Sequence, residues 1–182
     1  MAPILGIYAS QISGHLTPPS SYYSIATVTV GSGGVSSITF SSIPSTYTHL
    51  QLRYNTFGTI NIAIQFSGDT AAHYGMHVLD GNGSAATAGL YSPNYSYAYL
   101  SLNGNSSATT GIAGVTDILD YTSTNKNKTL RTLVGIDLNG SGGIELNSGL
   151  WTNTSAITSI TILPDGGNPF KQYTSFALYG IR

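Results

Sequence analysis

In the segment INIAIQF (residues 60–66), large apolar side chains occupy every second position. The apolar parity consists of Ile60, Ile62, Ile64 and Phe66. The other parity carries the smaller or polar side chains Asn61, Ala63 and Gln65. Because successive side chains of a β-strand point to opposite faces of a sheet, this alternation predicts a strand with one face buried in a core.

The same two-residue period recurs along most of the chain. In HLQLRY (49–54), the inward side chains are Leu50, Leu52 and Tyr54, and the outward ones are His49, Gln51 and Arg53. In TLRTLVGIDL (129–138), the inward side chains are Leu130, Val134, Ile136 and Leu138. Similar runs cover 22–30, 35–40, 95–102, 111–121, 143–151, 156–163 and 173–182. No segment carries a convincing helical stripe, so we expect strands throughout.

Glycine-rich turns separate these runs. They are GSGG (31–34), DGNG (80–83), NGN (103–105), NGSGG (139–143) and PDGGNP (164–169). About ten short strands joined by such turns predict an all-β fold, a jelly-roll-like β-sandwich formed by residues 21–182 as a single domain. Residues 68–94 show the least regular pattern, and we expect them to form a long excursion from the sandwich.

The first 20 residues, MAPILGIYASQISGHLTPPS, differ from the rest and predict an N-terminal docking arm. Its apolar side chains are Ile4, Leu5, Ile7, Tyr8, Ile12 and Leu16. Neither a signal peptide nor a membrane span is expected, because no Lys or Arg precedes Arg53 and glycine and polar residues interrupt the apolar run. Two local structures stay open for the arm: its apolar residues have helical spacing, and an extended chain would let residues 1–17 reach roughly 56 Å.

The composition excludes several classes of partner. The 182 residues carry a net charge of −1, only 7% of them are charged, and no cysteine occurs. The few basic residues are scattered, so we expect no nucleic-acid partner. Since 41% of the residues are hydrophobic, the chain has enough apolar material for a folded core. A surface so poor in charge favours association with further copies or with a larger assembly, and this association should depend little on salt.

Four tyrosines form the first candidate site. The sequence YSYAYL (95–100) places Tyr95, Tyr97 and Tyr99 on one face of an expected strand, with Tyr91 nearby. Amphipathic aromatic side chains of this kind either bury at a subunit interface or core edge, or stack on sugar rings. Because Leu100 and Leu102 occupy the opposite parity, both faces of the strand need cover, which favours an oligomer contact over a glycan face.

Two histidines form the second candidate. His73 and His77 lie four residues apart, flanked by Asp69 and Asp80, and a strand here would place both imidazoles on one face, where a carboxylate could complete a metal site. The residues between them carry no further ligand type, so polar surface or loop anchoring is the expected role. DGNG offers one carboxylate where a calcium loop needs several, so we expect a turn and no bound metal or cofactor.

No catalytic constellation emerges from the sequence. A G-x-S-x-G elbow is absent, and no carboxylate pair occupies same-face positions of neighbouring strands. Charged residues around the TNKNKT loop (124–129) are expected to make turn and edge contacts; they are Asp117, Asp120, Lys126, Lys128 and Arg131. Trp151, the single tryptophan, is expected to be buried under the loop that follows it, with glycan stacking as the minor alternative. We therefore expect a protein without enzymatic activity.

Several strings resemble those of virion structural proteins of tailed bacteriophages, phages of cyanobacteria among them. These strings are PILGIYASQISGH (3–15), SITFSSIPSTYTHLQLR (37–53), DILDYTSTNKNKTLRTLVG (117–135), SGLWTNTSAITSITI (148–162) and SFALYGIR (175–182). The resemblance implies a small β-sandwich protein that assembles as a symmetric oligomer, a homotrimer, on the particle surface. Members of this class are tail-fibre, tail-associated or capsid-decorating proteins.

The favoured expectation is a capsid-decorating, or cement, protein whose N-terminal arm docks on the major capsid protein or another virion protein. The chain lacks a fibre shaft, coiled-coil heptads and repeats, so it cannot extend far from the particle alone. The alternative is a tail-fibre or receptor-binding module, in which the tyrosines and residues 68–94 bind a host-surface glycan.

Overall fold

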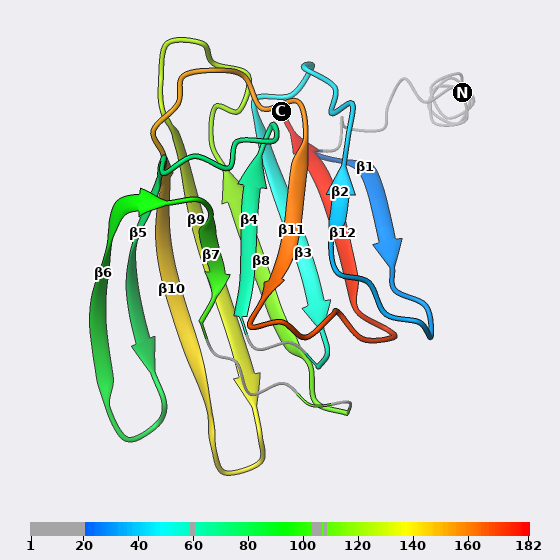
Figure 1. The fold of residues 1–182 in the computed structure, drawn as a ribbon, viewed down its shortest axis with the longest axis vertical. Coiled ribbons are helices and arrows are strands. Elements are labelled where there is room, and N and C mark those ends of the chain that lie inside the picture. Colours follow the sequence, from blue (N-terminus) through cyan, green and yellow to red (C-terminus); the bar gives the residue numbers. More distant parts are fainter. Residues whose placement is uncertain (1–20, 59–60, 103–106, 108) are drawn as a thin grey trace, which may run out of the picture.

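Two antiparallel sheets face each other in the computed structural model, which describes residues 21–58, 61–102, 107 and 109–182 (Figure 1). The predicted docking arm (1–20) and Ile60 lie outside the described residues. The strands are β1 Tyr22–Thr29, β2 Ile38–Phe40, β3 His49–Thr56, β4 Asn61–Phe66, β5 Tyr74–Gly81, β6 Ala86–Tyr95, β7 Ala98–Ser101, β8 Ile112–Ile118, β9 Lys128–Asp137, β10 Gly142–Trp151, β11 Ile160–Asp165 and β12 Ser175–Ile181. The described residues contain no helix, so the predicted all-β class is confirmed.

The topology is that of a jelly roll with an extension on one sheet. The large sheet has the order β1-β12-β3-β8-β9-β10-β5-β6, and the small sheet has the order β2-β11-β4-β7. The pairs β1–β12, β2–β11, β3–β8 and β4–β7 are nested within one another along the chain, as in a double-stranded ribbon rolled into a sandwich. Strands β9, β10, β5 and β6 lengthen the large sheet beyond this unit (Figure 1).

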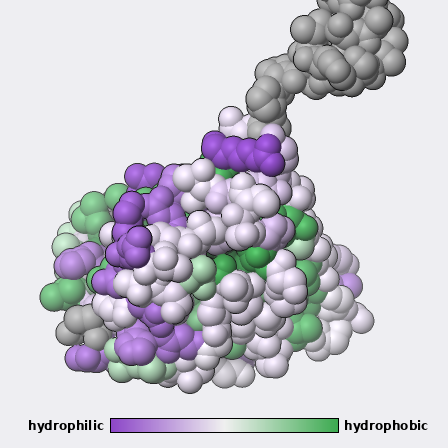
Figure 2. Space-filling model, turned by 90° about the horizontal axis from the view of Figure 1, so that it is seen from above, coloured by the Kyte–Doolittle hydropathy of each residue, from purple (hydrophilic) through white to green (hydrophobic). Residues whose placement is uncertain are grey.

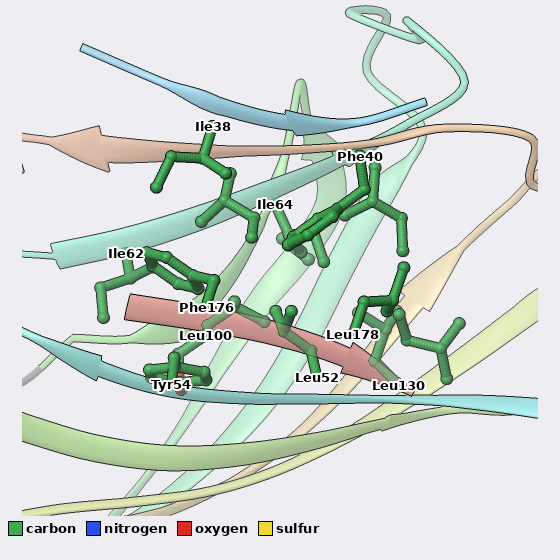
Figure 3. Packing of buried hydrophobic residues seen from close by; sticks show 14 of the residues in the cluster. Ile38, Phe40, Leu52, Tyr54, Ile62, Ile64, Leu100, Leu130, Phe176 and Leu178 are labelled. Atoms are coloured by element: carbon green, nitrogen blue, oxygen red, sulfur yellow. The ribbon is translucent and has the colours of Figure 1, made fainter. Parts of the chain in front are cut away.

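The core between the sheets is formed by the parities that the sequence predicts. Leu50, Leu52 and Tyr54 of β3 are buried, as are the apolar residues of β4. In Figure 3, Ile62 and Ile64 lie opposite Leu52 and Tyr54 of the large sheet. Further members of this core are Ile38, Phe40, Leu100, Leu130, Phe176 and Leu178 (Figure 3). The predicted inward face of residues 129–138 is confirmed for Leu130, Val134 and Ile136, whereas Leu138 is half-buried.

The expected irregular excursion of residues 68–94 is wrong. Most of this segment is the regular hairpin β5–β6, which forms one edge of the large sheet. Glycines and a register shift between Tyr74 and Met76 break the two-residue period, so the strands are hard to recognise in the sequence. The predicted DGNG turn connects the two strands: Gly83 adopts a φ of 85°, and the Asn82 side chain accepts hydrogen bonds from the following amides.

Candidate interaction surface

In the first half of strand β10, the polar side chains of Glu145 and Asn147 lie inside the sandwich and the apolar side chains of Ile144 and Leu146 lie outside. Glu145 and Asn147 are each only 2% exposed, whereas the exposed fractions of Ile144 and Leu146 are 57% and 46%. The partner strand β9 imposes this orientation, because directly paired residues share a face of the sheet. Leu146 is paired with Leu133, the outward parity of β9, so it must point outward as well.

The buried polar residues of β10 have hydrogen-bond partners that make their inward position tolerable. The Glu145 carboxylate accepts a hydrogen bond from the backbone N–H of Leu102 (3.0 Å) and another from the Asn147 side chain (3.3 Å). The Asn147 amide also donates to the carbonyl of Leu100. Since a buried polar group without partners costs about 1–3 kcal/mol, these contacts offset part of the cost of the inward orientation, although Asn147 Oδ1 has no hydrogen-bond partner among the described residues.

Five aliphatic side chains from four neighbouring strands share the outer side of the large sheet. We name them the outer apolar face; they are Leu79, Leu90, Leu133, Ile144 and Leu146, and all are exposed. Cross-strand pairing joins them: Leu146 lies between Leu133 and Leu79, and the Leu133 row continues to Val115 on β8. Figure 2 shows hydrophobic surface at its left end, the side on which Figure 1 draws β5, β6 and β10.

A shallow depression of about 620 Å³ borders this face. Its lining includes Gly135, which places no side chain between Ile144 and Ala113, its cross-strand neighbours. Arg53 lies at its far side, where the guanidinium stacks on the rings of Tyr22 and Tyr179, 5.1 Å from each centroid. The outer side of the large sheet therefore carries an apolar patch over β9, β10, β5 and β6, bordered on the same side by Arg131, Ser148 and His77, and a polar, aromatic region toward β1.

The structure brings the four predicted tyrosines together, but from two sheets. Tyr91 and Tyr95 belong to β6 and Tyr99 to β7, so the predicted single strand over 95–102 is wrong: the chain changes sheets after Tyr95. Ring centroids lie 5.1 Å apart for Tyr97 and Tyr99 and 6.1 Å apart for Tyr91 and Tyr99. The cluster thus involves the edge strands of both sheets, β6 and β7, and Tyr95 remains 38% exposed. Its role as interface or glycan face stays a prediction.

A carboxylate anchors this cluster. The Tyr99 hydroxyl donates a hydrogen bond to Asp165 Oδ2 (2.8 Å) and lies 3.3 Å from the Tyr97 hydroxyl. Burial raises the pKa of Tyr99 above its ordinary value, and the neighbouring Tyr97 and Asp165 raise it further. The Tyr99 phenol therefore remains a protonated hydrogen-bond donor, and its aromatic ring is held in one position.

The predicted histidine pair separates in the fold. His73 precedes β5 and hydrogen-bonds with Asp69 Oδ2 (2.8 Å), whereas His77 lies on β5 paired with Ser148 on the outer side. Among the described residues, no group of three or more histidine, cysteine or acidic side chains could hold a metal ion. His73 instead helps to fix the loop before β5.

Asp69 of that loop is hydrogen-bonded to Trp151 at the end of β10. Trp151 is 1% exposed, which confirms its predicted burial, and its indole N–H donates to Asp69 Oδ2 (2.8 Å). The other Asp69 oxygen accepts the N–H of Ala71 (2.9 Å). The carboxylate thus joins the loop to strand β10.

We expect the stability of the protein to fall in acid because of Asp69. Burial raises its pKa, but the hydrogen bonds from His73, Trp151 and Ala71 lower it more, from 3.8 to about 2. A folded-state pKa below the unfolded value gives stability that is present above about pH 4 and is lost as the pH falls through about 2. Melting temperatures between pH 5 and pH 2 should therefore decline less steeply for Asp69→Asn than for the wild type. Asp137→Asn, at an exposed strand end, is the control, and parallel curves for the wild type and Asp69→Asn would contradict the prediction.

The charged residues near TNKNKT make one of the expected turn contacts, between Lys126 and Asp120, whereas Arg131 and Asp117 pair across two interior strands and not at an edge. Arg131 lies 3.2 Å from Asp117 across β8 and β9, and Lys126 lies 2.9 Å from Asp120. Lys128 instead is fully buried, and its ammonium donates to the backbone carbonyls of Lys126 and Thr154. Burial lowers the pKa of Lys128, so this side chain is part of the internal structure and not of an edge.

No protein-family model, no curated protein and no solved structure matches the chain. The described residues contain no helix long and apolar enough to cross a membrane.

The outer apolar face is the surface that the sequence analysis missed. Taken alone, the alternation of residues 143–151 favours Ile144 and Leu146 as core residues, since their neighbours are Glu145 and Asn147. The exposed face can be recognised only when β9 and β10 are read together. The inward positions of β9 carry leucine and valine, so Leu133 at the other parity must point outward. Its cross-strand partner Leu146 on β10 then points outward as well and extends an apolar outer row.

Proposed function

We propose that this chain is a non-enzymatic structural protein of a tailed-bacteriophage particle, and that it decorates the capsid surface as a homotrimer. The observation that carries the proposal is the outer apolar face, because exposed apolar groups on several adjacent strands are typical of a surface that contacts another protein. The resemblance of the strings quoted above to virion proteins supplies the type of assembly. The apolar N-terminal arm is the device that attaches each subunit to the capsid.

Locating the protein on intact particles tests this function. An antibody against residues 21–182 would be gold-labelled and applied to particles of the virus that encodes the chain, and light scattering would give the subunit number. We expect label over the whole capsid surface. Label confined to the tail would overturn the decorating role and favour the alternative function, and unlabelled particles would reject both.

The alternative is a tail-fibre or receptor-binding module that recognises a host-surface glycan. The tyrosine cluster favours it, because half-exposed rings beside the Asp165 carboxylate offer both a stacking platform and a hydrogen-bond acceptor for sugar hydroxyls. Selective binding on a glycan array that is lost in Tyr95→Ala would support this function. Absence of binding would leave the decorating role.

Attachment should be nearly indifferent to salt. The outer apolar face and the first 20 residues contain no Asp, Glu, Lys or Arg, so neither depends on charge pairs. Raising NaCl from about 0.1 M to about 1 M shortens the screening length from about 10 Å to about 3 Å and weakens only charge-based contacts. In a sedimentation assay, the particle-bound fraction should stay constant over this range. Release by 1 M NaCl would refute apolar attachment.

A further inference from the structure

The outer apolar face requires a cover in the free protein. Five exposed aliphatic side chains on adjacent strands form one patch on the antiparallel sheet. Such patches on isolated proteins promote aggregation unless something covers them. The chain itself supplies a candidate, since its first 20 residues are rich in large apolar side chains and lie outside the described structure.

The position at which this segment joins the sheet suits that role. Ser21 directly precedes β1, whose Tyr22 is paired with Ile181 and lies on the outer side, because Arg53 stacks on the Tyr22 ring. β1 is the edge strand at the polar end of the large sheet, and five strand spacings separate it from β10. At about 4.8 Å each, these spacings amount to about 24 Å across the sheet.

The offset along the strands is set by the pairing register. Tyr22 is aligned through Ile181 with His49 on β3. Leu146 is aligned through Leu133 and Val115 with Arg53, which also lies on β3. The two rows are therefore four residues apart along β3. Four residues correspond to about 13 Å. The in-plane path from Tyr22 to Leu146 is therefore about 27 Å, or about eight residues of extended chain.

The residue types of the N-terminal segment match this path. Residues 13–20 (SGHLTPPS), mostly polar or proline, have the length needed to cross the polar region of the sheet. Residues 4–12 (ILGIYASQI) then reach the apolar patch, and they contain five of the six large apolar residues of the arm. Neither residues 4–12 nor the five residues of the outer apolar face include Asp, Glu, Lys or Arg, so this contact would bury no charged side chain of either set.

We propose that residues 4–12 of each chain lie on the outer apolar face of the same subunit in the free protein. A segment held in this way is present at a high effective concentration, so even a weak contact is populated. The arm then has two alternative partners, its own sheet or the particle, and attachment requires it to leave the sheet. The inference concerns the free protein, so it can hold or fail independently of the proposed function.

Spin-label distances test this arrangement, and the absence of native cysteine makes labelling specific. The full chain would carry labels at Ala9→Cys in the arm and Ser148→Cys, an exposed outer residue of β10. An arm on the face keeps the two labels within about 25 Å, since the apolar patch is only about 20 Å wide. An unattached arm gives a broad distribution centred near 30 Å, from its flexible-chain dimensions and the width of the sheet.

Two substitutions and a control make the test specific. Leu146→Asp charges the face, and Ile7→Asp charges the arm, so each should convert the short distances into the broad distribution. Thr27→Asp, on the outer side of β1 away from the arm's path, should leave the short distances unchanged.

Dilution with unlabelled chain shows whether the arm lies on its own subunit or on a neighbouring one. With a tenfold excess of unlabelled chain, short distances within one subunit persist. Short distances that disappear on dilution would assign the arm to a neighbouring copy and overturn the proposal. A broad distribution in the unsubstituted labelled protein, or short distances that neither charged variant alters, would overturn it as well.

Discussion

Replacing Trp151 by alanine should lower the free energy of unfolding by about 3–5 kcal/mol, the range typical of a large aromatic residue removed from a core. The Trp151 ring packs against Phe66 (5.5 Å between centroids) and is stacked on Tyr74 (6.3 Å). Its N–H also donates to Asp69, so alanine leaves both a cavity and an acceptor without one of its donors. The effect should be large because this side chain connects β10, the loop before β5 and the small sheet.

Denaturant titration followed by circular dichroism measures this change and does not rely on the fluorescence of the tryptophan that is removed. Trp151→Phe keeps most of the apolar volume but removes the donor, so it should cost less than alanine. Leu133→Ala, which shortens an exposed side chain, is the matched control and should cost under about 1 kcal/mol. A loss below 1 kcal/mol for Trp151→Ala would contradict the central role of this residue.

A chain that starts at Ser20 is expected to lose attachment to the particle while its fold remains. Among the described residues, the buried core begins at Val30, so we expect melting to change by only a few degrees. Under the proposed decorating role, attachment should be affected much more strongly, because each arm would bind weakly after the cost of ordering its backbone and stable decoration would need several arms of one oligomer acting together.

Co-sedimentation with undecorated particles measures this loss. Ile7→Asp should weaken binding in the full chain, since it would bury a charge, whereas Ser13→Asp changes a polar position and serves as the control. Full occupancy by the shortened chain would show that the arm is not the anchor and would remove the main support for the decorating role.

Periodicity predicts most of the sandwich because the decisive information is local. Residues 49–54, 61–66 and 130–136 each contain an apolar parity long enough to fix which side faces the core, and the structure confirms it. The ion pair between Lys126 and Asp120 can likewise be expected from the sequence, because the two residues are close in the chain.

What the sequence could not predict depends on pairing between distant strands. The inward position of Glu145 follows from its neighbours on β9 and β5, and the burial of Lys128 depends on the carbonyl of Thr154 in another loop. Tyr95 and Tyr99 are separated by a change of sheet that no alternation signals. In each case a non-local contact determines the position of a side chain.

The position of β12 has a consequence for synthesis on the ribosome. β12 is the last of the described strands along the chain, yet it lies inside the large sheet, between β1 and β3, and pairs with both. A nascent chain therefore exposes two unpaired strand edges until residue 181 has left the exit tunnel, and the large sheet closes only after translation of the whole domain. Such long-range pairing folds slowly, and the edges of β1 and β3 are open to edge-to-edge aggregation until β12 pairs with them.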